Sequence, residues 1–428
     1  MTIGRVGSGG DAGNRTQSFI TGFTTEWKKG PAVLFYSILL LYLAQAHIER
    51  AKWVTSPLVL QRGTLPRIAA FLTICYIVAV LIRYRLCIWT VLLGCALAVV
   101  CVTQQRFWMQ MRYEVRMVIL ASALILMAAG KAYRKIAVCY LAVTAAGIAL
   151  TLAGQLFHFT EDIVLDDPGK LMLVGIGHSM GYVHPNTFAK YVFLLCILIW
   201  YLWLQRRFLL SALVCWDGAL FIWFVSRNRM LTLLLVCFPL LVLCRRFLCR
   251  TEASHLAGIF KKCADLVLIG MPYLLLALSV FLSSHVYGMT IRFQGTSLWT
   301  MASRFEQAGI ALWKYGIHLF GQSLDLSGQI AMSFNGNQHK LLAVDNGYMF
   351  YLLTRGLVYI LVLLAVPACV HAKCIREKNS RVLFISCLFL LCGLMEAYPL
   401  RVEFNLTFLY LFARGVDGPL EKEGGALV

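Results

Sequence analysis

Two arginines stand between two apolar runs of this sequence, at a place where charge is costly. They belong to the segment SRNRM, residues 226–230, and we expect Arg227 and Arg229 at or just inside a membrane boundary. An arginine at the centre of a membrane helix costs about 2.5–3.5 kcal/mol on insertion scales. Guanidinium groups match phosphate oxygens in pairs, so an inward-facing pair predicts an anion site. The alternative is a tight turn that exposes both arginines to lipid headgroups.

A second polar group stands at the start of another apolar run. The segment GYVHPNTFAKYVF, residues 181–193, places His184 and Asn186 on either side of a proline. Proline suits the first turn of a helix, and Asn186 or Thr187 can cap that helix. Lys190 follows Asn186 by four residues, so it shares that helix face one turn deeper. The pattern predicts a helix start, and it brings a histidine and a cation to the same boundary.

A third group opens the segment VDNGYMFYLLTRG, residues 344–356. Asp345 and Asn346 precede the apolar run, and a carboxylate favours a helix N-terminus, so a capping role is the simplest interpretation of Asp345. Arg355 lies more than two turns further along, where an ion pair with a group such as Asp217 would be structural.

A fourth group lies in a long polar stretch. The segment SRFEQAGIALWKYGIHLFGQSL, residues 303–324, predicts an amphipathic helix that ends at a glycine turn. Arg304 in its first turn can bind an acid or face solvent. The glycine-rich GIGHSMG, residues 175–181, follows no predicted strand and lacks the patterns of nucleotide-binding loops.

The composition indicates the environment in which these polar groups lie. Of 428 residues, 60% are hydrophobic and 14% are charged, with a mean hydropathy of +0.74, which is typical of an integral membrane protein. The net charge of +19 is scattered over short connections, so it does not indicate a nucleic-acid partner. The 15 cysteines lie mostly in apolar runs without metal-ligand spacing, and we expect no metal site.

We predict an all-α, polytopic membrane protein with about twelve transmembrane helices, since each apolar run is roughly long enough to cross a bilayer core. The expected spans lie near residues 32–48, 67–83, 86–103, 116–131, 136–156, 187–204, 208–225, 230–244, 266–282, 347–370, 382–398 and 404–413.

Charge fixes the expected orientation. Alternate connections are rich in Lys and Arg, and the others hold nearly all the acids, so we place the N- and C-termini inside. The expected organisation is a cytoplasmic tail over residues 1–30, one transmembrane domain over residues 31–413 and a second cytoplasmic tail over residues 414–428. Two outer loops, residues 157–186 and residues 283–346 between helices 9 and 10, are longer than connections need, which indicates a working outer face.

Taken in order, these groups resemble the O-antigen ligase and polymerase superfamily of integral membrane enzymes. The resemblance rests on four motifs over roughly residues 170–360. They are HPN at His184, the SR turn at Arg227, an R-x-x-x-x-G-x-x-x-W helix with a terminal F-G-x-S at Arg304, and the DNGY helix start at Asp345.

The resemblance implies a glycosyltransferase that works on the outer face of a membrane. Members of this superfamily take a glycan from an undecaprenyl-pyrophosphate donor and transfer it to an acceptor hydroxyl, without a metal or other cofactor. The groups expected to hold the pyrophosphate are Arg227, Arg229, Lys190 and Arg304, and Arg227 is also expected to be catalytic.

One departure favours a polymerase, whose acceptor is a second lipid-linked repeat unit. Where ligases of the superfamily show a His-His or His-x-His-Asn pattern, this chain has VDN, so Asp345 is the candidate base and His184 the alternative. Asn186, Asn346 and Tyr348 are expected near the acceptor. The competing hypotheses are a ligase-type transferase and a transporter or flippase of lipid-linked oligosaccharide.

The expected setting is the cytoplasmic membrane of a bacterium, with the products being capsule, exopolysaccharide or O-antigen. The expected partners are the lipid-linked donor and acceptor, the bilayer, a flippase and a chain-length regulator. The sequence has no detectable internal repeat, which argues against a transporter built from inverted repeats.

Overall fold

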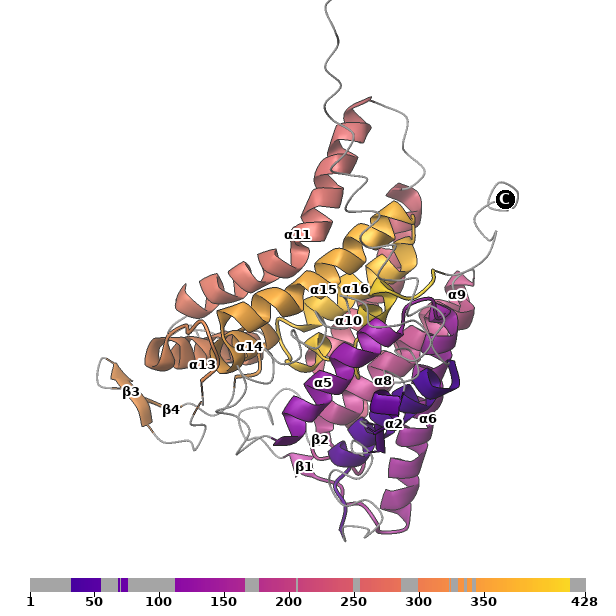
Figure 1. Cartoon of the computed structure of the whole chain (residues 1–428). Coiled ribbons are helices and arrows are strands. Elements are labelled where there is room, and N and C mark those ends of the chain that lie inside the picture. Colours follow the sequence, from indigo (N-terminus) through magenta and orange to yellow (C-terminus); the bar gives the residue numbers. More distant parts are fainter. Residues whose placement is uncertain are drawn as a thin grey trace, which may run out of the picture.

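The computed structural model places most of the chain in helices (Figure 1). It describes residues 32–54, 68–69, 71–75, 112–165, 177–204, 207–248, 255–285, 299–322, 324, 330–334, 337–340 and 344–415. The α-helices are α2 (Ala32–Arg50), α5 (Arg112–Met127), α6 (Tyr133–Leu156), α8 (Pro185–Ile199), α9 (Phe208–Val225), α10 (Arg229–Leu248), α11 (His255–His285), α13 (Trp299–Tyr315), α14 (Gly347–Arg355), α15 (Leu357–Arg376) and α16 (Ser380–Cys392).

Shorter elements complete the described chain. A π-helical turn, η3 (Trp200–Leu204), extends α8, and two 3₁₀ helices, η4 (Tyr398–Leu400) and η5 (Leu406–Leu411), follow α16. Two small antiparallel hairpins pair β1 (Val164–Leu165) with β2 (Gly177–His178), and β3 (Ile330–Phe334) with β4 (Asn337–Lys340). The fold is therefore all-α with minor strand content, as the apolar runs predict.

Six helices in the described chain are long and apolar enough to cross a membrane. They are α2, α6, α8 with η3, α9, the Lys262–His285 part of α11, and α15. Three shorter apolar stretches lie in α5, α10 and α16. The chain is thus a multi-pass membrane protein, and the total of twelve spans stays a prediction. The expected span 86–103 and the tail 1–30 lie outside the described residues, as do most of span 67–83 and of tail 414–428.

Three expected spans differ from the structure. The run 382–398 ends early, because α16 stops at Cys392 and the residues that follow form turns and η4. The run 347–370 is broken at Gly356 into α14 and α15, because the backbone there takes a φ of +90° that glycine adopts at little cost. The run 404–413 is wrong as a spanning helix. Its buried centre forms η5, and a 3₁₀ helix of 6 residues is only about 12 Å long at roughly 2 Å per residue. It packs instead against α5, α6 and α15.

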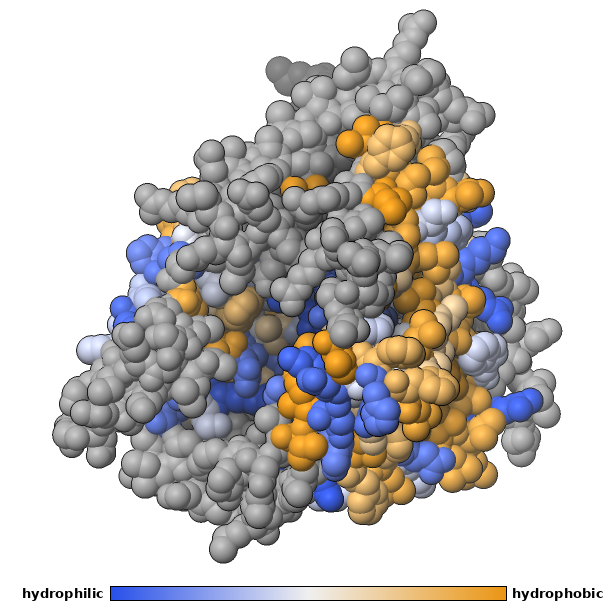
Figure 2. Space-filling model, turned by 90° about the horizontal axis from the view of Figure 1, so that it is seen from below, coloured by the Kyte–Doolittle hydropathy of each residue, from blue (hydrophilic) through white to orange (hydrophobic). Residues whose placement is uncertain are grey.

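The apolar surface follows from this arrangement. Helix α8 is the most buried candidate span, with 72% of its apolar window inside the protein, whereas the same windows of α9 and α11 are 33% and 28% buried. One face of α9 is exposed and apolar, and it carries Leu209, Leu213, Leu220 and Phe224. Figure 2 shows hydrophobic residues gathered over one flank, with hydrophilic residues nearer the centre of that view. The exposed flank therefore suits contact with lipid.

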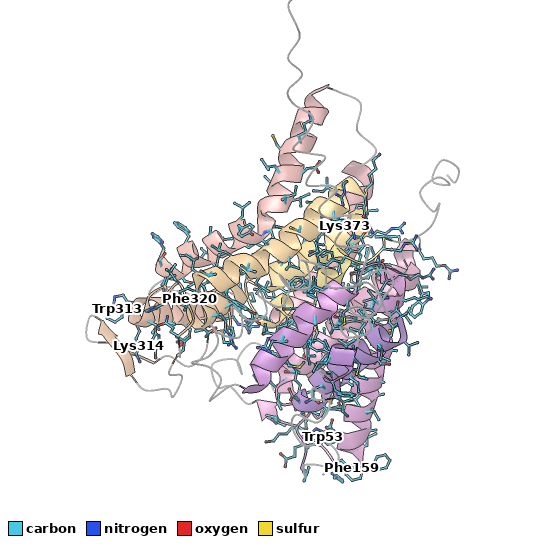
Figure 3. All side chains as sticks on the ribbon, viewed as in Figure 1. Trp53, Phe159, Trp313, Lys314, Phe320 and Lys373 are labelled. Carbon is cyan, nitrogen blue, oxygen red and sulfur yellow. The ribbon has the colours of Figure 1, made fainter. Side chains whose placement is uncertain are left out.

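Helix α2 ends at the same end of the bundle at which α8 begins. The backbone N–H of Val183 donates to the carbonyl of Arg50 at 2.8 Å, and a β-bridge joins Trp53 to Thr160. We call this the site end. Figure 3 labels Trp53 and Phe159 close together at this tip, and Lys373 lies at the far end of α15.

The loop before α8 is held by one carboxylate. Asp162 accepts hydrogen bonds from the backbone N–H groups of Ser179 and Met180 at 2.8 and 2.9 Å, and its other oxygen lies 2.7 Å from Nδ1 of His178. Burial works to raise the pKa of Asp162, but the hydrogen bonds from His178, Met180 and Ser179 outweigh it and lower that pKa. This loop fixes the chain a few residues before His184.

Candidate functional site

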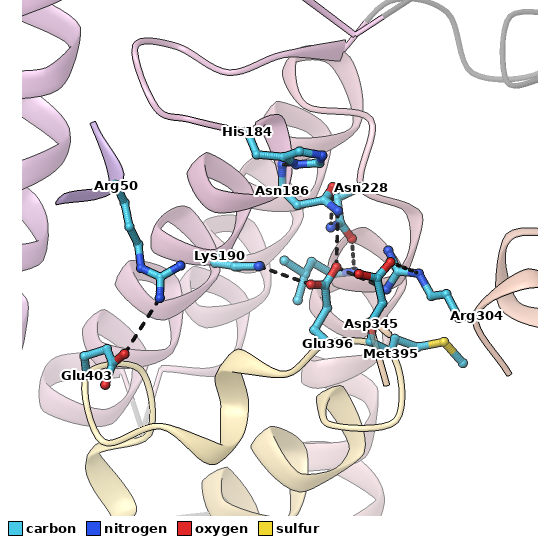
Figure 4. A network of polar contacts seen from close by, with 11 residues as sticks. Arg50, His184, Asn186, Lys190, Asn228, Arg304, Asp345, Met395, Glu396 and Glu403 are labelled. Carbon is cyan, nitrogen blue, oxygen red and sulfur yellow. Dashed lines mark hydrogen bonds and ion pairs between the residues drawn. The ribbon is translucent and has the colours of Figure 1, made fainter. Parts of the chain in front are cut away.

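A buried carboxylate, Glu396, lies at the centre of the polar groups at the site end (Figure 4). Its Oε2 lies 3.1 Å from Nζ of Lys190, and its Oε1 lies 3.1 Å from Nη1 of Arg304. The same Oε1 accepts a hydrogen bond from Nδ2 of Asn186 at 3.2 Å. Burial works to raise the pKa of Glu396, but Lys190 and Arg304 outweigh it and hold that pKa below its usual range.

Lys190 is positioned from two sides. It projects from α8 toward Glu396, and its Nζ lies 4.2 Å from the centroid of the Tyr398 ring. Its side chain is 11% exposed, so the ammonium group is largely removed from water. A buried cation needs such partners, because an unpaired charge in the interior is strongly unfavourable. The cation expected one turn below Asn186 is therefore in the cluster.

His184 starts α8 and also caps it. Its Nδ1 accepts the backbone N–H of Asn186 at 3.0 Å, so the cap is His184 and not Asn186 or Thr187. A neutral histidine that accepts at Nδ1 carries its proton on Nε2. In that form the exposed Nε2 can donate a proton but cannot accept one, and the cap thus disfavours His184 as a general base.

Two asparagines connect α8 to the turn that holds the arginines. Nδ2 of Asn228 donates to Oδ1 of Asn186 at 3.1 Å, and Oδ1 of Asn228 accepts from the backbone of Leu231 in the first turn of α10. Asn186 thus bonds to Glu396 on one side and to Asn228 on the other. The SRNRM turn is joined to the cluster by this chain of hydrogen bonds.

Arg227 stands next to Asn228 in an unusual backbone conformation. Its φ is +58°, in the left-handed region that costs roughly 1–2 kcal/mol for a residue with a Cβ. Its Nε is buried without a hydrogen-bond partner among the described residues, and its guanidinium carbon lies 5.9 Å from the Phe224 ring centroid. Strain and an unmatched buried donor at one residue are more frequent at functional sites than elsewhere. Arg229 is half-buried in the first turn of α10.

Arg304 joins Glu396 to the start of α14. Its Nη1 also donates to the carbonyl of Met395, and its Nε lies 3.6 Å from Oδ2 of Asp345. The Asp345 side chain is 48% exposed, whereas that of Glu396 is 8% exposed. Asp345 is therefore the carboxylate of this cluster that a molecule arriving from solvent can reach.

Asn346 and Tyr348 are turned into the protein instead. Asn346 caps α14 by accepting the N–H of Met349 at 2.9 Å, and its Nδ2 donates to Ser279 and to the carbonyl of Leu394. Tyr348 donates its hydroxyl to the carbonyl of Leu390 at 2.8 Å. Both side chains are fully buried, so we leave them out of the proposed site. The cap of α14 is Asn346, which leaves the Asp345 carboxylate to Arg304.

A separate cavity lies beside the Glu396 cluster, at the end of α2. It has a volume of about 70 Å³, and its lining includes Arg50, Arg355, Arg401 and Glu403. Figure 4 places the Arg50–Glu403 pair on the far side of Lys190 from Glu396. Arg355 therefore lines a polar cavity, whereas Asp217 is exposed on α9. The sequence suggested an ion pair of Arg355 with a group such as Asp217, and that pair is not formed.

The central carboxylate and this cavity are absent from the sequence-based site. Glu396, Arg401 and Glu403 fall in the segment MEAYPLRVEF, residues 395–404, directly after an apolar run. In the sequence-based expectation Glu396 falls in the last turn of span 382–398, whereas Arg401 and Glu403 fall in the short connection before span 404–413. The available signal was its density of charge, because three charged residues among so few are costly inside a membrane helix.

No model of a known protein family, no characterised protein and no solved structure matches this chain.

Proposed function

We propose that this protein is a metal-independent glycosyltransferase that polymerises polyprenyl-pyrophosphate-linked oligosaccharide repeat units. The observation that carries the proposal is the convergence of Lys190, Arg304 and the Arg227 turn at the site end, from three segments far apart in the sequence. Guanidinium and ammonium groups can neutralise a pyrophosphate leaving group where other glycosyltransferases use a metal ion. The likeness to the O-antigen ligase and polymerase superfamily supports the same function.

The proposed orientation puts the site end outside the cytoplasmic membrane of a bacterium. Basic residues favour the cytoplasmic side of membrane proteins. The turns at the end opposite the site are basic and include Arg134, Lys135, Arg207, Arg376, Lys378 and Arg381. On this arrangement both termini lie inside, and the site receives lipid-linked substrate after a flippase has moved it across. A chain-length regulator is the further proposed partner.

The proposed reaction is a displacement at the anomeric carbon of the donor sugar. The bond from that carbon to the phosphate oxygen breaks, and the polyprenyl pyrophosphate leaves with the electron pair. The acceptor hydroxyl oxygen forms the new glycosidic bond, and its proton passes to the exposed carboxylate of Asp345. Arg227, Arg304 and Lys190 neutralise the charge that grows on the leaving group.

The contribution of the cations has a definite scale. Each hydrogen bond to a charged group is worth about 1.5–3 kcal/mol. Two such contacts that strengthen as the bond breaks would raise the rate by roughly 10² to 10⁴.

The remaining polar residues of the proposed site divide between the two substrates. We place Arg229 near the donor, and His184 and Asn186 near the acceptor. The protonated Nε2 of His184 can orient the acceptor hydroxyl.

Expression in a strain that makes the lipid-linked repeat unit but lacks its own polymerase tests this proposal. We expect a ladder of increasing repeat number with the wild type and single units with Arg227→Ala, both proteins being correctly inserted. Arg376→Ala, an exposed arginine at the opposite end, is the matched control and should keep the ladder. Single units from the wild type, with precursor accumulating, would contradict a polymerase and favour a ligase or a transporter.

A further inference from the structure

We propose that the cavity at the end of α2 binds a phosphate-type oxyanion, at a subsite separate from the Glu396 cluster. The proposal concerns binding and stands whether or not the protein is a polymerase. Three arginines line the cavity, Arg50 at the end of α2, Arg355 at the end of α14 and Arg401 directly after η4. Segments this far apart in the sequence bring three positive groups to one small space.

The charges of the lining favour an anion. Glu403 lies 3.8 Å from both Arg50 and Arg401, which is longer than the 2.7–3.2 Å usual for an N–H···O hydrogen bond. The other oxygen of Glu403 accepts the hydroxyl of Tyr42 at 2.8 Å. Among the described residues that line the cavity, three arginines face two acids, Glu49 and Glu403, so this part of the lining has an excess of one positive charge. Arginine forks match phosphate oxygens better than any other side chain.

The size of the cavity fits the same ligand. Its volume is about 70 Å³, whereas a cavity that holds a single water needs roughly 10–15 Å³. It therefore has room for about as many atoms as the heavy atoms of one phosphate group. Tyrosine hydroxyls complete the lining, because Tyr351 lies 3.0 Å from Nε of Arg401 and Tyr42 lies against Glu403. These hydroxyls hold charged groups of the lining in place, and the arginines are the groups that phosphate oxygens would meet.

The phosphate can come from two sources, a polyprenyl phosphate lipid or free phosphate in water. Thermal unfolding of the purified full chain in detergent, titrated with inorganic phosphate and separately with a short-chain polyprenyl phosphate, distinguishes them. A ligand that binds the folded state raises the unfolding midpoint, and the rise increases with the ligand concentration relative to its Kd. A rise in the unfolding midpoint with only one of the two ligands supports the site and identifies that ligand as the source of the phosphate. A shift with neither overturns the proposal.

Variants connect the shift to this cavity. Arg355→Ala should weaken the apparent phosphate affinity by about tenfold or more, equivalent to one lost charge-assisted contact. Arg355→Lys, which keeps the charge, covers the case in which the alanine variant fails to fold, and it should show a smaller loss. The exposed Arg376→Ala should bind as the wild type does.

A purely structural Arg355 gives a different result. Arginine at the C-terminal end of a helix stabilises it through the helix dipole. In that case Arg355→Ala lowers the midpoint without ligand but leaves the phosphate affinity unchanged, and the proposal is wrong. Phosphate binding that depends on Arg355 in a protein that makes no polymer would uphold this site and reject the polymerase.

Discussion

At the scale of single residues, the site is organised around one shared carboxylate. Glu396 holds Lys190 and Arg304 in fixed positions, because each is within 3.1 Å of one of its oxygens. A buried ion pair of this kind contributes little net stability, yet removal of one member is strongly destabilising. Glu396 is therefore the group that positions two cations, while Asp345 is the exposed carboxylate to which the proposed function assigns the acceptor proton.

We expect Arg227→Gly to separate the role of the side chain from that of the backbone. Glycine adopts a φ of +58° without the penalty that other residues meet, so the variant should unfold at the same midpoint as the wild type or higher. It should nevertheless lose polymer formation, because the guanidinium is gone. Polymer at the wild-type level in this variant would remove Arg227 from the mechanism.

Glu396→Gln should lower the free energy of unfolding by about 3–5 kcal/mol, since two buried cations lose their carboxylate. Unfolding in detergent by thermal or chemical means measures the change. Glu377→Gln, at a partly exposed acid at the opposite end, should change it by roughly 0–1 kcal/mol. The double variant Glu396→Gln with Lys190→Met should regain part of the lost free energy of unfolding. If none is regained, Lys190 and Glu396 are not energetically coupled.

The same carboxylate gives a pH dependence with a definite sign. The pKa of Glu396 is lowered in the folded protein, so its contribution to stability is fully present above the unfolded value of about 4.3. That contribution is lost as the pH falls through the folded pKa. Stability measured from neutral pH down to acid should fall more steeply for the wild type than for Glu396→Gln. Parallel curves would contradict the assignment.

At the scale of elements, the apolar runs predicted most of the described helices well and failed where the backbone turns within a run. The expected span 208–225 coincides with α9, because arginine and serine bound its apolar run on either side. The expected span 347–370 includes a break at Gly356, and the polar residues just before it, Thr354 and Arg355, do not by themselves specify a turn because both fit within a helix. Only the φ of +90° at Gly356 and its neighbours in space identify the turn.

Gly356→Ala should destabilise the fold by about 1–3 kcal/mol or more, because the new Cβ would combine overpacking with a strained φ. That Cβ would lie 2.6 Å from the carbonyl oxygen of Leu319. Gly270→Ala in α11 is the matched control, since its Cβ would meet nothing within 4 Å. Glycine to alanine inside a helix should stabilise it by about 0.5–1 kcal/mol. Equal unfolding midpoints for the two variants would contradict the strain at Gly356.

At the scale of the whole molecule, the sequence predicted a membrane protein and several residues of one cluster, but not the residue that joins them. His184, Asn186, Lys190, Arg304 and Asp345 do lie around one site. Glu396 follows them in the chain by 51 residues or more, and its contacts depend on how α8, α13 and the segment after α16 pack. Pairings of that range are set by tertiary structure, which local patterns do not specify.

The proposed orientation predicts which positions are reached from outside. A cysteine placed at His184 or Asp345 should react with a membrane-impermeant maleimide in intact cells, because both side chains are exposed at the site end. A cysteine placed at Lys378 should react only after the membrane is opened. The parent chain, which has its own exposed cysteines, gives the background. Labelling of the Lys378 position in intact cells would reverse the orientation.

Polymerisation by the purified protein, in lipid vesicles supplied with the lipid-linked repeat unit, tests the proposed function most directly. We expect a series of lengthening glycans and one polyprenyl pyrophosphate released for each bond formed, without added metal and in the presence of a chelator. Arg227→Gly should be folded and release none. A wild-type protein that inserts correctly, receives substrate on the proposed outer face and forms no glycosidic bond would contradict the proposed polymerase function.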